Sequence, residues 1–462
     1  MRWLLLVLVA CKPIEIDDKK RVDDDTAVTT PTPSPTTPST PEGHPEFSNP
    51  DEATDLDADP DVLHVALTAA AHTHSIGGEQ IAGYAYNGQT PGPTLRMKIG
   101  DTLIVDLQND LDVETTIHWH GVAAPYDMDG VTWQMAPVAA GDSFTYQFEI
   151  HEAGTFWYHP HFDTESQVDL GLYGVLIVED PAEPSADEEL IMVFDAWDEV
   201  SDHTDEAADH HGLDPARVAW TVNGGLLPIY EGTGGTTARV RVLNVSNTGY
   251  LDLPPMRQIG EDQGLLPAAI DDERAVLGPG DRVEFEWLIE DSWTLQASPY
   301  SVNGGEAWGD DFDLLEIEVA STDSATPVSW PFSGDRPSID PGHTDIVYVF
   351  TGESGGEGWM INAEIFPDVT VEELPLGAEA IVEIRNLSPA EHPFHMHGHH
   401  FEVLSLGGEI PAFKRITDTV NLPIGQALRI RLVADNPGDW MTHCHILPHA
   451  HQGMMTVLRV LE

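Results

Sequence analysis

Four short clusters of histidine hold the residues of this chain that are best suited to bind transition metals. They are HWHG (118–121), HPH (159–161), HPFHMHGHH (392–400) and HCHILPHAHQGMM (443–455). Imidazole suits zinc, copper, iron and nickel, whereas cysteine and methionine sulfur favour softer ions such as copper(I). One such pair is weak evidence, because two histidines on a strand can simply be solvated. Four clusters, one of them around a cysteine, predict a site for several metal ions.

The spacing within these clusters predicts how the side chains point. In a β-strand, residues two apart share a face, and the residue between them faces the other way. Three pairs are therefore expected to project together: His118 with His120, His159 with His161, and His395 with His397. By the same rule, His443 and His445 share one face while Cys444 points to the opposite side. We expect two metal sites back to back across this strand.

The ligand types distinguish the two sites. On the cysteine side, Cys444 is followed by His449 and Met454, and His392 is a fourth candidate. Two histidines, a cysteine and a weak axial methionine form a blue-copper electron-transfer centre. The opposite side offers eight imidazoles and no thiolate: His118, His120, His159, His161, His395, His397, His443 and His445. Eight imidazoles suit a cluster of copper ions with open positions, whereas structural zinc sites are usually closed and four-coordinate.

The elements that must position these residues are predicted to be β-strands. Short alternating segments are broken by Gly, Pro, Asp and Asn, as in TLIVDLQN (102–109), DRVEFEWLIE (281–290) and ALRIRLVADN (427–436). Alternation between close turns favours antiparallel β-sandwiches over a parallel α/β sheet. No long amphipathic helix is expected, although residues 198–212 could hold a short one.

A loose internal repeat predicts the number of domains. Segments 86–109, 221–247 and 360–388 each contain an early Asn, a Pro, a stretch of small residues and a β run. Three copies predict three related sandwiches, with the boundaries 61–185, 186–337 and 338–462.

The N-terminal 60 residues predict export and attachment to a membrane. Residues 1–10 read as a signal peptide, since their apolar run is too short to span a bilayer as a helix. The ending LVAC resembles a bacterial lipobox, which predicts that Cys11 carries a lipid in the cell envelope or periplasm. Residues 11–60 are predicted to be a disordered Pro/Thr-rich and acidic linker. With Cys11 acylated, Cys444 has no disulfide partner, because the chain has only two cysteines.

The charge of the chain excludes one class of partner. It contains 79 acidic and 20 basic residues, for a formal net charge of −59. Such a surface repels nucleic acid phosphates and attracts cations. We therefore expect no nucleic acid partner, and a membrane contact only through Cys11.

The four motifs resemble those of the multicopper oxidases, specifically the three-domain laccase-like and bacterial copper-oxidase group. The resemblance covers residues 61–462 and implies an all-β chain of three cupredoxin-like Greek-key sandwiches, with the copper cluster between the first and last. It also implies four copper ions: one type 1, one type 2 and two type 3. By position, His392, Cys444, His449 and Met454 match the type 1 ligands, and His118 and His395 match the type 2 ligands. The type 3 positions are His120, His159, His161, His397, His443 and His445.

The resemblance further implies an oxidase that takes electrons from a small reductant and reduces dioxygen to water. The reductant could be a phenol, an aromatic amine or Cu(I), the last as in copper-detoxifying relatives. The few and scattered methionines favour an organic reductant, and the acidic surface favours a cation. Other readings are a non-catalytic copper-binding or envelope protein of the same fold, and a nitrite-reducing copper protein, which normally has two domains.

One carboxylate is a candidate donor of protons to the cluster, and a second donor that the family often has is missing from this sequence. Asp129 lies where the family places an acid near the cluster, although it could also be a simple turn residue before Gly130. Many relatives carry an acid directly after the position of His449, but here this residue is Ala450. Seven further histidines are not expected to be principal ligands: His72, His74, His203, His210, His211, His399 and His400.

Overall fold

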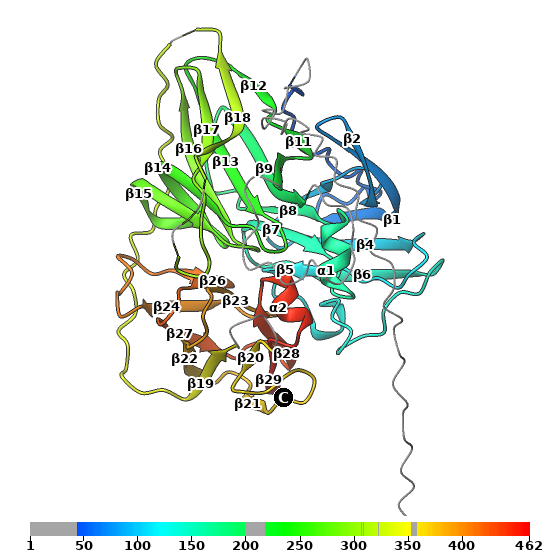
Figure 1. The fold of residues 1–462 in the computed structure, drawn as a ribbon, viewed down its shortest axis with the longest axis vertical. Coiled ribbons are helices and arrows are strands. Elements are labelled where there is room, and N and C mark those ends of the chain that lie inside the picture. Colours follow the sequence, from blue (N-terminus) through cyan, green and yellow to red (C-terminus); the bar gives the residue numbers. More distant parts are fainter. Residues whose placement is uncertain (1–43, 199–217, 306, 308, 322, 353–357) are drawn as a thin grey trace, which may run out of the picture. The chain divides into compact units, whose positions relative to one another are not determined.

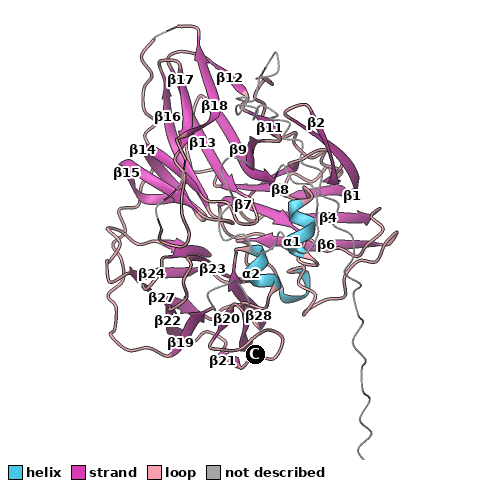
Figure 2. Ribbon diagram, viewed as in Figure 1, coloured by secondary structure: helices cyan, strands magenta, loops and turns pink. Residues whose placement is uncertain are grey.

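The computed structural model of the protein describes residues 44–198 and 218–462, apart from positions 306, 308, 322 and 353–357. Strands make up nearly all of its regular structure, so the all-β prediction is confirmed (Figure 2). Helices are η1 (Tyr126–Met128), α1 (Thr164–Asp169) and α2 (Leu447–His451). Among the described residues, no helix is both long and apolar enough to cross a membrane. The helix considered for residues 198–212 falls almost entirely outside the described ranges.

The first pair of sheets lies within the predicted segment 61–185. One sheet has the strand order β2-β1-β4-β6 and the other the order β3-β8-β7-β5 (Figure 1). The strands are β1 (Val62–Ile76), β2 (Glu79–Tyr86), β3 (Gly92–Lys98), β4 (Thr102–Asn109), β5 (His118–His120), β6 (Ser143–Glu149), β7 (Gly154–His159) and β8 (Gly174–Glu179).

The second pair lies within the predicted segment 186–337. A seven-stranded sheet has the order β11-β10-β9-β13-β16-β14-β15, and a three-stranded sheet has the order β12-β18-β17. The strands are β9 (Glu188–Asp198), β10 (Val218–Val222), β11 (Gly225–Leu226), β12 (Ile229–Gly232), β13 (Thr236–Asn244), β14 (Leu251–Glu261), β15 (Gly264–Leu277), β16 (Arg282–Ile289), β17 (Trp293–Ala297) and β18 (Phe312–Val319).

The third pair lies within the predicted segment 338–462. Its sheets have the orders β20-β19-β22-β27-β24-β25 and β21-β29-β28-β23-β26. The strands are β19 (Ile346–Thr351), β20 (Met360–Ile361), β21 (Val371–Pro375), β22 (Glu379–Asn386), β23 (His392–Met396), β24 (Phe401–Leu406), β25 (Ile416–Thr417), β26 (Thr419–Leu422), β27 (Ala427–Val433), β28 (Gly438–Cys444) and β29 (Met455–Leu461).

The strand directions differ from the purely antiparallel arrangement that we expected. Each sandwich also contains parallel pairs: β1–β4, β3–β8, β9–β13, β12–β18, β19–β22 and β21–β29. Between β1 and β4, for example, the chain passes through β3 of the opposite sheet. Such a long connection allows the strand to return in the same direction, which a tight hairpin cannot do.

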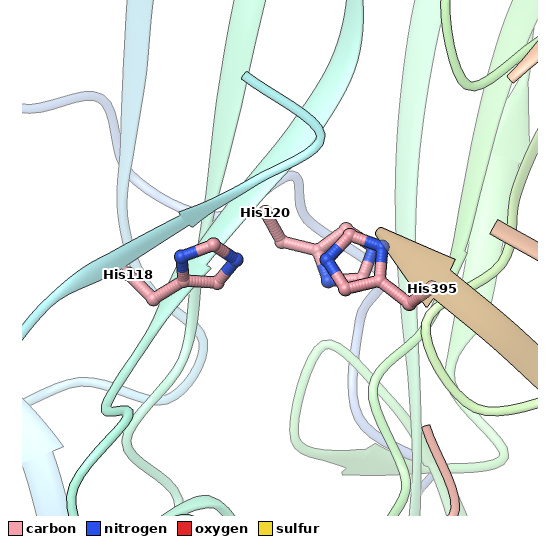
Figure 3. Close-up of side chains that lie close together, drawn as sticks. All are labelled: His118, His120 and His395. Carbon is pink, nitrogen blue, oxygen red and sulfur yellow. The ribbon is translucent and has the colours of Figure 1, made fainter. Parts of the chain in front are cut away.

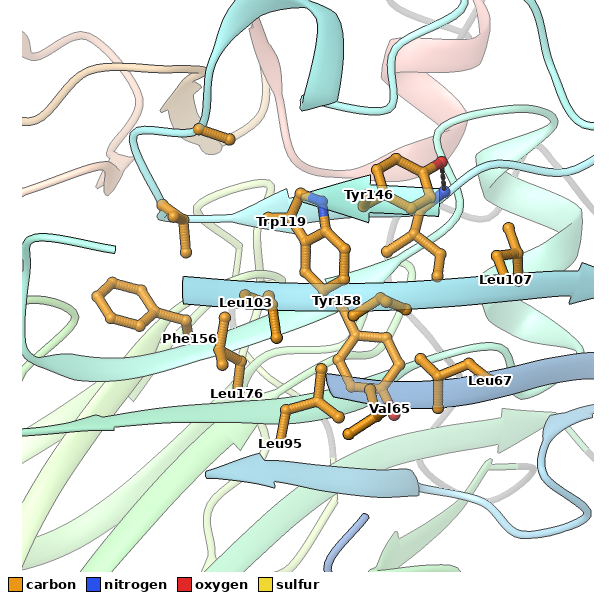
Figure 4. Close-up of a cluster of buried hydrophobic side chains, with 14 of the residues drawn as sticks. Val65, Leu67, Leu95, Leu103, Leu107, Trp119, Tyr146, Phe156, Tyr158 and Leu176 are labelled. Carbon is orange, nitrogen blue, oxygen red and sulfur yellow. Dashed lines mark hydrogen bonds between the residues drawn. The ribbon is translucent and has the colours of Figure 1, made fainter. Parts of the chain in front are cut away.

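The core of the first sandwich anchors one of the histidine motifs. Alternate residues of β4, namely Leu103, Val105 and Leu107, are fully buried, and burial stabilises such side chains by about 1.5–3 kcal/mol each. In the same core, the Ile117 amide donates a hydrogen bond of 2.8 Å to the Tyr146 hydroxyl (Figure 4). This bond holds the start of β5 directly before His118.

The linker prediction for residues 11–60 is wrong at its C-terminal end. Backbone hydrogen bonds join Phe47 to Ile229 (2.7 Å) and Ala53 to Thr94 (2.9 Å). Phe47 also packs edge-on against Tyr230, with 5.9 Å between ring centroids. The stretch from residue 44 is therefore ordered, because β3 and β12 offer it unpaired edge groups. The signal peptide, Cys11 and the Pro/Thr-rich stretch lie outside the described residues.

Candidate metal centre

Four strands bring the four histidine motifs together. In the first sandwich, β5 pairs with β7 so that His118 lies opposite His159. In the third sandwich, β23 pairs with β28 so that His395 lies opposite His443. The motifs of the two sandwiches face one another, because β5 brings His118 and His120 to the centre from one side and β23 brings His395 from the other (Figure 3). Segments nearly 300 residues apart in the chain thus form one centre.

The cysteine side forms a compact group of three ligand-type residues. The Cys444 sulfur lies 3.3 Å from Nδ1 of His392 and 3.6 Å from Nδ1 of His449. These two Nδ1 atoms are themselves only 3.2 Å apart. Met454 is fully buried in the same apolar cluster, and its carbonyl accepts a 3.2 Å hydrogen bond from the Cys444 amide. The structure therefore brings together all four residues that we predicted on this side.

A tryptophan that the sequence did not single out covers this group. The Trp359 ring stacks on His449, with 4.0 Å between centroids and 28° between planes. It also contacts His392 edge-on at 5.2 Å. Trp359 stands in a glycine-rich stretch without a recognisable ligand motif, so no sequence signal pointed to it.

The histidine side divides into three groups, in each of which the ligand atoms lie within 4.8 Å of one another. The groups are His118 with His120 and His395, His120 with His159 and His445, and His161 with His397 and His443. The rings of His120 and His395 stack at 3.9 Å with 10° between planes (Figure 3). All eight predicted histidines are therefore in one continuous set.

We expected the two histidines of each HxH pair to project together. The paired side chains do lie near each other, but they do not always belong to the same ligand group. His159 ends β7 and His161 follows it, and their ring centroids are 6.3 Å apart. These two histidines nevertheless join different groups, as do His443 and His445. The chain turns at each strand end, so the second residue of the pair no longer follows the strand rule. Cys444, inside β28, does follow it and faces away from His443.

Several imidazole nitrogens in the centre are buried without a hydrogen-bond partner. They are Nε2 of His118, His159 and His395, Nδ1 of His120, and both nitrogens of His445. Burying a polar group without a partner costs about 1–3 kcal/mol. Metal ions would satisfy these atoms, and the combination of many imidazoles with one thiolate and one thioether fits copper.

Burial also sets the protonation of these side chains. Desolvation lowers the pKa of His392 and of His443 to about 3, and lowers that of His159, His161 and His445 well below its ordinary value. These five imidazoles are thus neutral at pH 7, which is the form that binds metal. Burial raises the pKa of the Cys444 thiol instead, so a bound metal ion would be needed to hold the thiolate.

Asp129 is fully buried beside the histidine groups. Its carboxylate oxygens lie 3.1 Å from Nδ1 of His118 and 2.9 Å from Nδ1 of His397. Nδ1 of His118 is also 2.9 Å from the Asp129 carbonyl oxygen. Asp129 therefore orients two of the predicted ligands and leaves their Nε2 atoms directed into the centre.

A second buried carboxylate, which sequence reasoning missed, lies on another side of the centre. An oxygen of Asp418 is 3.2 Å from Nε2 of His120 and 3.5 Å from Nδ1 of His395. Arg282, from β16 of the middle sandwich, donates to Asp418 at 2.8 and 2.6 Å. Burial alone would raise the pKa of Asp418, but the arginine and the two histidines hold it well below its ordinary value. Asp418 looks like an ordinary strand-flanking residue in the sequence.

Of the other histidines singled out in the sequence, the four that the structure describes stay outside these groups, as we expected. His399 is buried and contacts Trp440 edge-on at 5.6 Å, while Nε2 of His400 lies 2.7 Å from the Gly121 carbonyl oxygen. His72 and His74 contact each other but join no described group of three ligand-type residues. His203, His210 and His211 lie outside the described residues.

Two sequence families described as multicopper oxidase match residues 68–183 and 338–462. The Staphylococcus epidermidis protein named Multicopper oxidase mco is 30% identical over 400 residues, which covers 81% of this chain and 83% of that protein. The chain belongs to the multicopper oxidase family. Its two matched segments hold all four histidine motifs, and the family implies that the protein binds copper and is an oxidoreductase.

A laccase and a solved structure are also similar to this chain in sequence and in fold. Laccase-2 of Botryotinia fuckeliana is 28% identical over 460 residues, covering 80% of this chain and 77% of that protein. The solved structure titled as a multicopper oxidase from Campylobacter jejuni, a metallo-oxidase, superposes with a TM-score of 0.78 at 26% identity. It covers 91% of this chain and 96% of that one. The predicted cupredoxin fold of this multicopper oxidase is thereby confirmed.

Proposed function

We propose that the protein couples one-electron oxidation of a small phenolic or aromatic reductant to the four-electron reduction of dioxygen to water. One observation supports this proposal most directly. Cys444 and His443 are consecutive residues at the end of β28, yet they belong to groups on opposite sides of that strand. The residues that would hold an electron-accepting copper ion are thus joined by covalent bonds to those that would hold the copper cluster for dioxygen reduction.

We assign the ligands to four copper ions, one type 1, one type 2 and two type 3. The type 1 ion would be held by His392, Cys444, His449 and Met454, and the type 2 ion by His118 and His395. One type 3 ion would be held by His120, His159 and His445, and the other by His161, His397 and His443, as the measured groups suggest.

Copper bound at these residues would supply the one-electron redox chemistry, and the chain supplies the environment for it. Burial of most of these histidines limits the access of bulk water to the centre, which strengthens electrostatic interactions there. Asp129 and Asp418 hold the imidazole rings in place. Asp129 is also positioned to donate a proton near His118 and His397.

A second candidate function, oxidation of Cu(I), is favoured by the covering of the type 1 residues. His392 is fully buried, and Trp359 stacks over His449. This covering restricts direct contact between a bulky phenol and either imidazole more than it restricts the approach of a small cation. The formal net charge of −59 would also attract such a cation.

Oxygen uptake by the copper-loaded protein discriminates between these reductants. We expect uptake with a dimethoxyphenol and no added copper. Uptake with Cu(I) alone, or phenol oxidation only after Cu(II) is added, would instead identify a copper-detoxifying oxidase. A copper-loaded protein that takes up no oxygen with any reductant would be a binding protein of this fold.

The type 1 assignment is tested by Cys444→Ser. We expect this variant to lose the blue colour of the copper-loaded protein, since the colour needs the thiolate, while copper on the histidine side is retained. Cys11→Ser removes the other cysteine of the chain and should keep the colour. Blue colour in the Cys444→Ser variant would refute the assignment.

We also propose that the chain is exported to the bacterial cell envelope and anchored through a lipid on Cys11. The LVAC ending and the Pro/Thr-rich stretch that follows it support this proposal. Incorporation of labelled fatty acid, abolished by Cys11→Ser, would be the expected result. A soluble, unlabelled protein would refute it.

A further inference from the structure

A cavity of about 290 Å³ leads from the protein surface to the histidine groups. His161 and His443, two proposed type 3 ligands, line its inner wall. Its outer wall includes Trp133, which is 42% exposed, and His451, whose side chain is 63% exposed. The cavity is therefore a path between solvent and the centre.

Most of this wall is apolar, and the alanine noted above is part of it. Met441, Leu447, Ala450, Met455 and Phe366 line the cavity. Ala450 carries no group that could exchange a proton, so the α2 side of the cavity lacks the acid that many relatives place there. A carboxyl group that serves this cavity must come from another element.

Glu165 of α1 supplies such a carboxyl group on the same wall. Helix α1 packs against α2, and Asn247 joins the two helices. The Asn247 side chain donates to the Glu165 carbonyl at 2.9 Å, and its own carbonyl accepts from the Leu447 amide at 3.1 Å. The position of Glu165 beside the cavity is thus set by the fold.

Among the described residues, two titratable groups act on the Glu165 carboxylate, namely His451 and Asp163, and both also line the cavity. The Glu165 carboxylate lies 3.7 Å from Nδ1 of His451 on α2, and Asp163 precedes it at the start of α1. The Glu165 side chain is only 24% exposed. Burial raises its pKa, the negative charge of Asp163 adds to this effect, and His451 opposes it. A carboxyl whose pKa is raised toward neutrality exchanges protons more effectively at pH 7.

We propose that Glu165 carries protons from solvent across this cavity to the centre at His161 and His443. The proposal rests on the proposed reduction of dioxygen, in which O₂, four electrons and four protons give two molecules of water. The reductant supplies the electrons one at a time through the type 1 residues. Solvent supplies the protons, which Glu165 takes up at the cavity and releases toward the centre. Asp129 contacts Nδ1 of His118 and of His397 and is not among the residues that line this cavity.

The first test follows reoxidation of the fully reduced, copper-loaded protein by dioxygen in a stopped-flow instrument across a pH series. Glu165→Gln should slow this step at least about tenfold and should remove the part of its pH dependence that arises from Glu165. Anaerobic reduction of the type 1 copper should keep its rate. Glu79→Gln, which changes an exposed carboxylate on β2, is the matched control and should behave as the unmodified protein.

A second variant separates proton transfer from structural damage. Ala450→Glu, introduced together with Glu165→Gln, places a carboxyl on the opposing helix of the same cavity and should restore most of the lost rate. Reoxidation of Glu165→Gln at the unmodified rate and with the unmodified pH profile would overturn the proposal.

An infrared titration of the resting copper-loaded protein provides a readout that does not depend on turnover. The difference between the unmodified protein and Glu165→Gln should contain a carboxyl band that titrates above the range of exposed glutamates. A band that titrates in the ordinary range would overturn the proposal. If the protein reduced no dioxygen at all, the proposed function would fail, and the infrared result would still establish the state of Glu165 separately.

Discussion

At the scale of single residues, two buried carboxylates determine how the histidines are presented to metal. A neutral imidazole can donate through only one nitrogen, and the nitrogen that donates to a carboxylate or carbonyl leaves the other one free to bind metal. Asp129 fixes this choice for His118 and His397, while Asp418 lies against His120 and His395. In His118, His120 and His395, the ring nitrogen that does not face a carboxylate is the one left without a hydrogen-bond partner.

We predict that Asp129→Asn lowers the rate of dioxygen reduction by about 10–100-fold, because an amide offers one acceptor where the carboxylate offers two. The blue colour and the anaerobic reduction of type 1 copper should remain, since Cys444 lies on the far side of β28. Stopped-flow absorption follows both steps. Asp127→Asn, an exposed change two residues earlier, is the control, and an equal effect of both variants would contradict the role of Asp129.

At the scale of elements, the turn that carries Asp129 packs closely against the backbone that precedes β5. Gly130 has φ +82, and a Cβ atom there would lie 1.8 Å from the Ile117 carbonyl oxygen. Ile117 directly precedes β5, so the turn and the HWH strand pack backbone against backbone. A tight approach of this kind fixes the distance between Asp129 and His118.

Gly130→Ala should therefore destabilise the protein by more than the roughly 1 kcal/mol that a residue with Cβ costs at positive φ. Gly141 also has φ +82, but nothing lies within 4 Å of its virtual Cβ, so Gly141→Ala carries the backbone cost without the clash. Thermal unfolding of the two variants measures the difference. Equal melting temperatures would show that the turn can relax away from Ile117.

At the scale of the whole molecule, the middle sandwich contributes to the metal centre although none of the predicted ligands belongs to it. Arg282 is fully buried and reaches from β16 to Asp418 of the third sandwich, which in turn contacts His120 of the first. Gln263 of the middle sandwich also donates to Asp418, at 2.9 Å. All three sandwiches thus meet at one carboxylate.

Replacing Arg282 with Met should leave Asp418 buried without its counter-charge, which costs about 3–5 kcal/mol of folding free energy. Copper should be lost first from the groups that contain His120, while the type 1 colour persists. Thermal unfolding, metal analysis and electron paramagnetic resonance measure these effects. Arg459→Met breaks an ion pair at the surface and should change little, because solvent screens such pairs. Full copper content in Arg282→Met would argue against this role.

The buried histidines should also make the copper-free protein sensitive to acid. The pKa of His392 and of His443 is about 3 in the folded chain and about 6.5 when unfolded. Their stabilising contribution is therefore complete above pH 6.5 and is lost progressively as the pH falls toward 3. For each of these two imidazoles, the free energy of unfolding falls by about 1.4 kcal/mol per pH unit in that window. The melting temperature of the copper-free protein should fall steeply between pH 6.5 and 4, and a flat profile would contradict the burial of neutral imidazoles.

The amino-acid sequence by itself determined the all-β fold. Apolar and polar residues alternate along segments such as 102–109 and 427–436, and this alternation matches which side chains are buried in the core. It also determined the ligand types and the opposite directions of Cys444 and His443, since both follow from the period of a strand. These are local properties. The domain boundaries and the lipid on Cys11 stay predictions.

Only the tertiary structure decided which histidines share a group, because HxH pairs separate where strands end. It also decided that Asp418, Arg282 and Trp359 border the centre, and that Glu165 faces a cavity beside Ala450. None of these residues stands in a motif with the ligands, and sequence separations such as 136 residues between Arg282 and Asp418 carry no signal of contact. Their proximity arises from the packing of three sandwiches against one another, which no local pattern encodes.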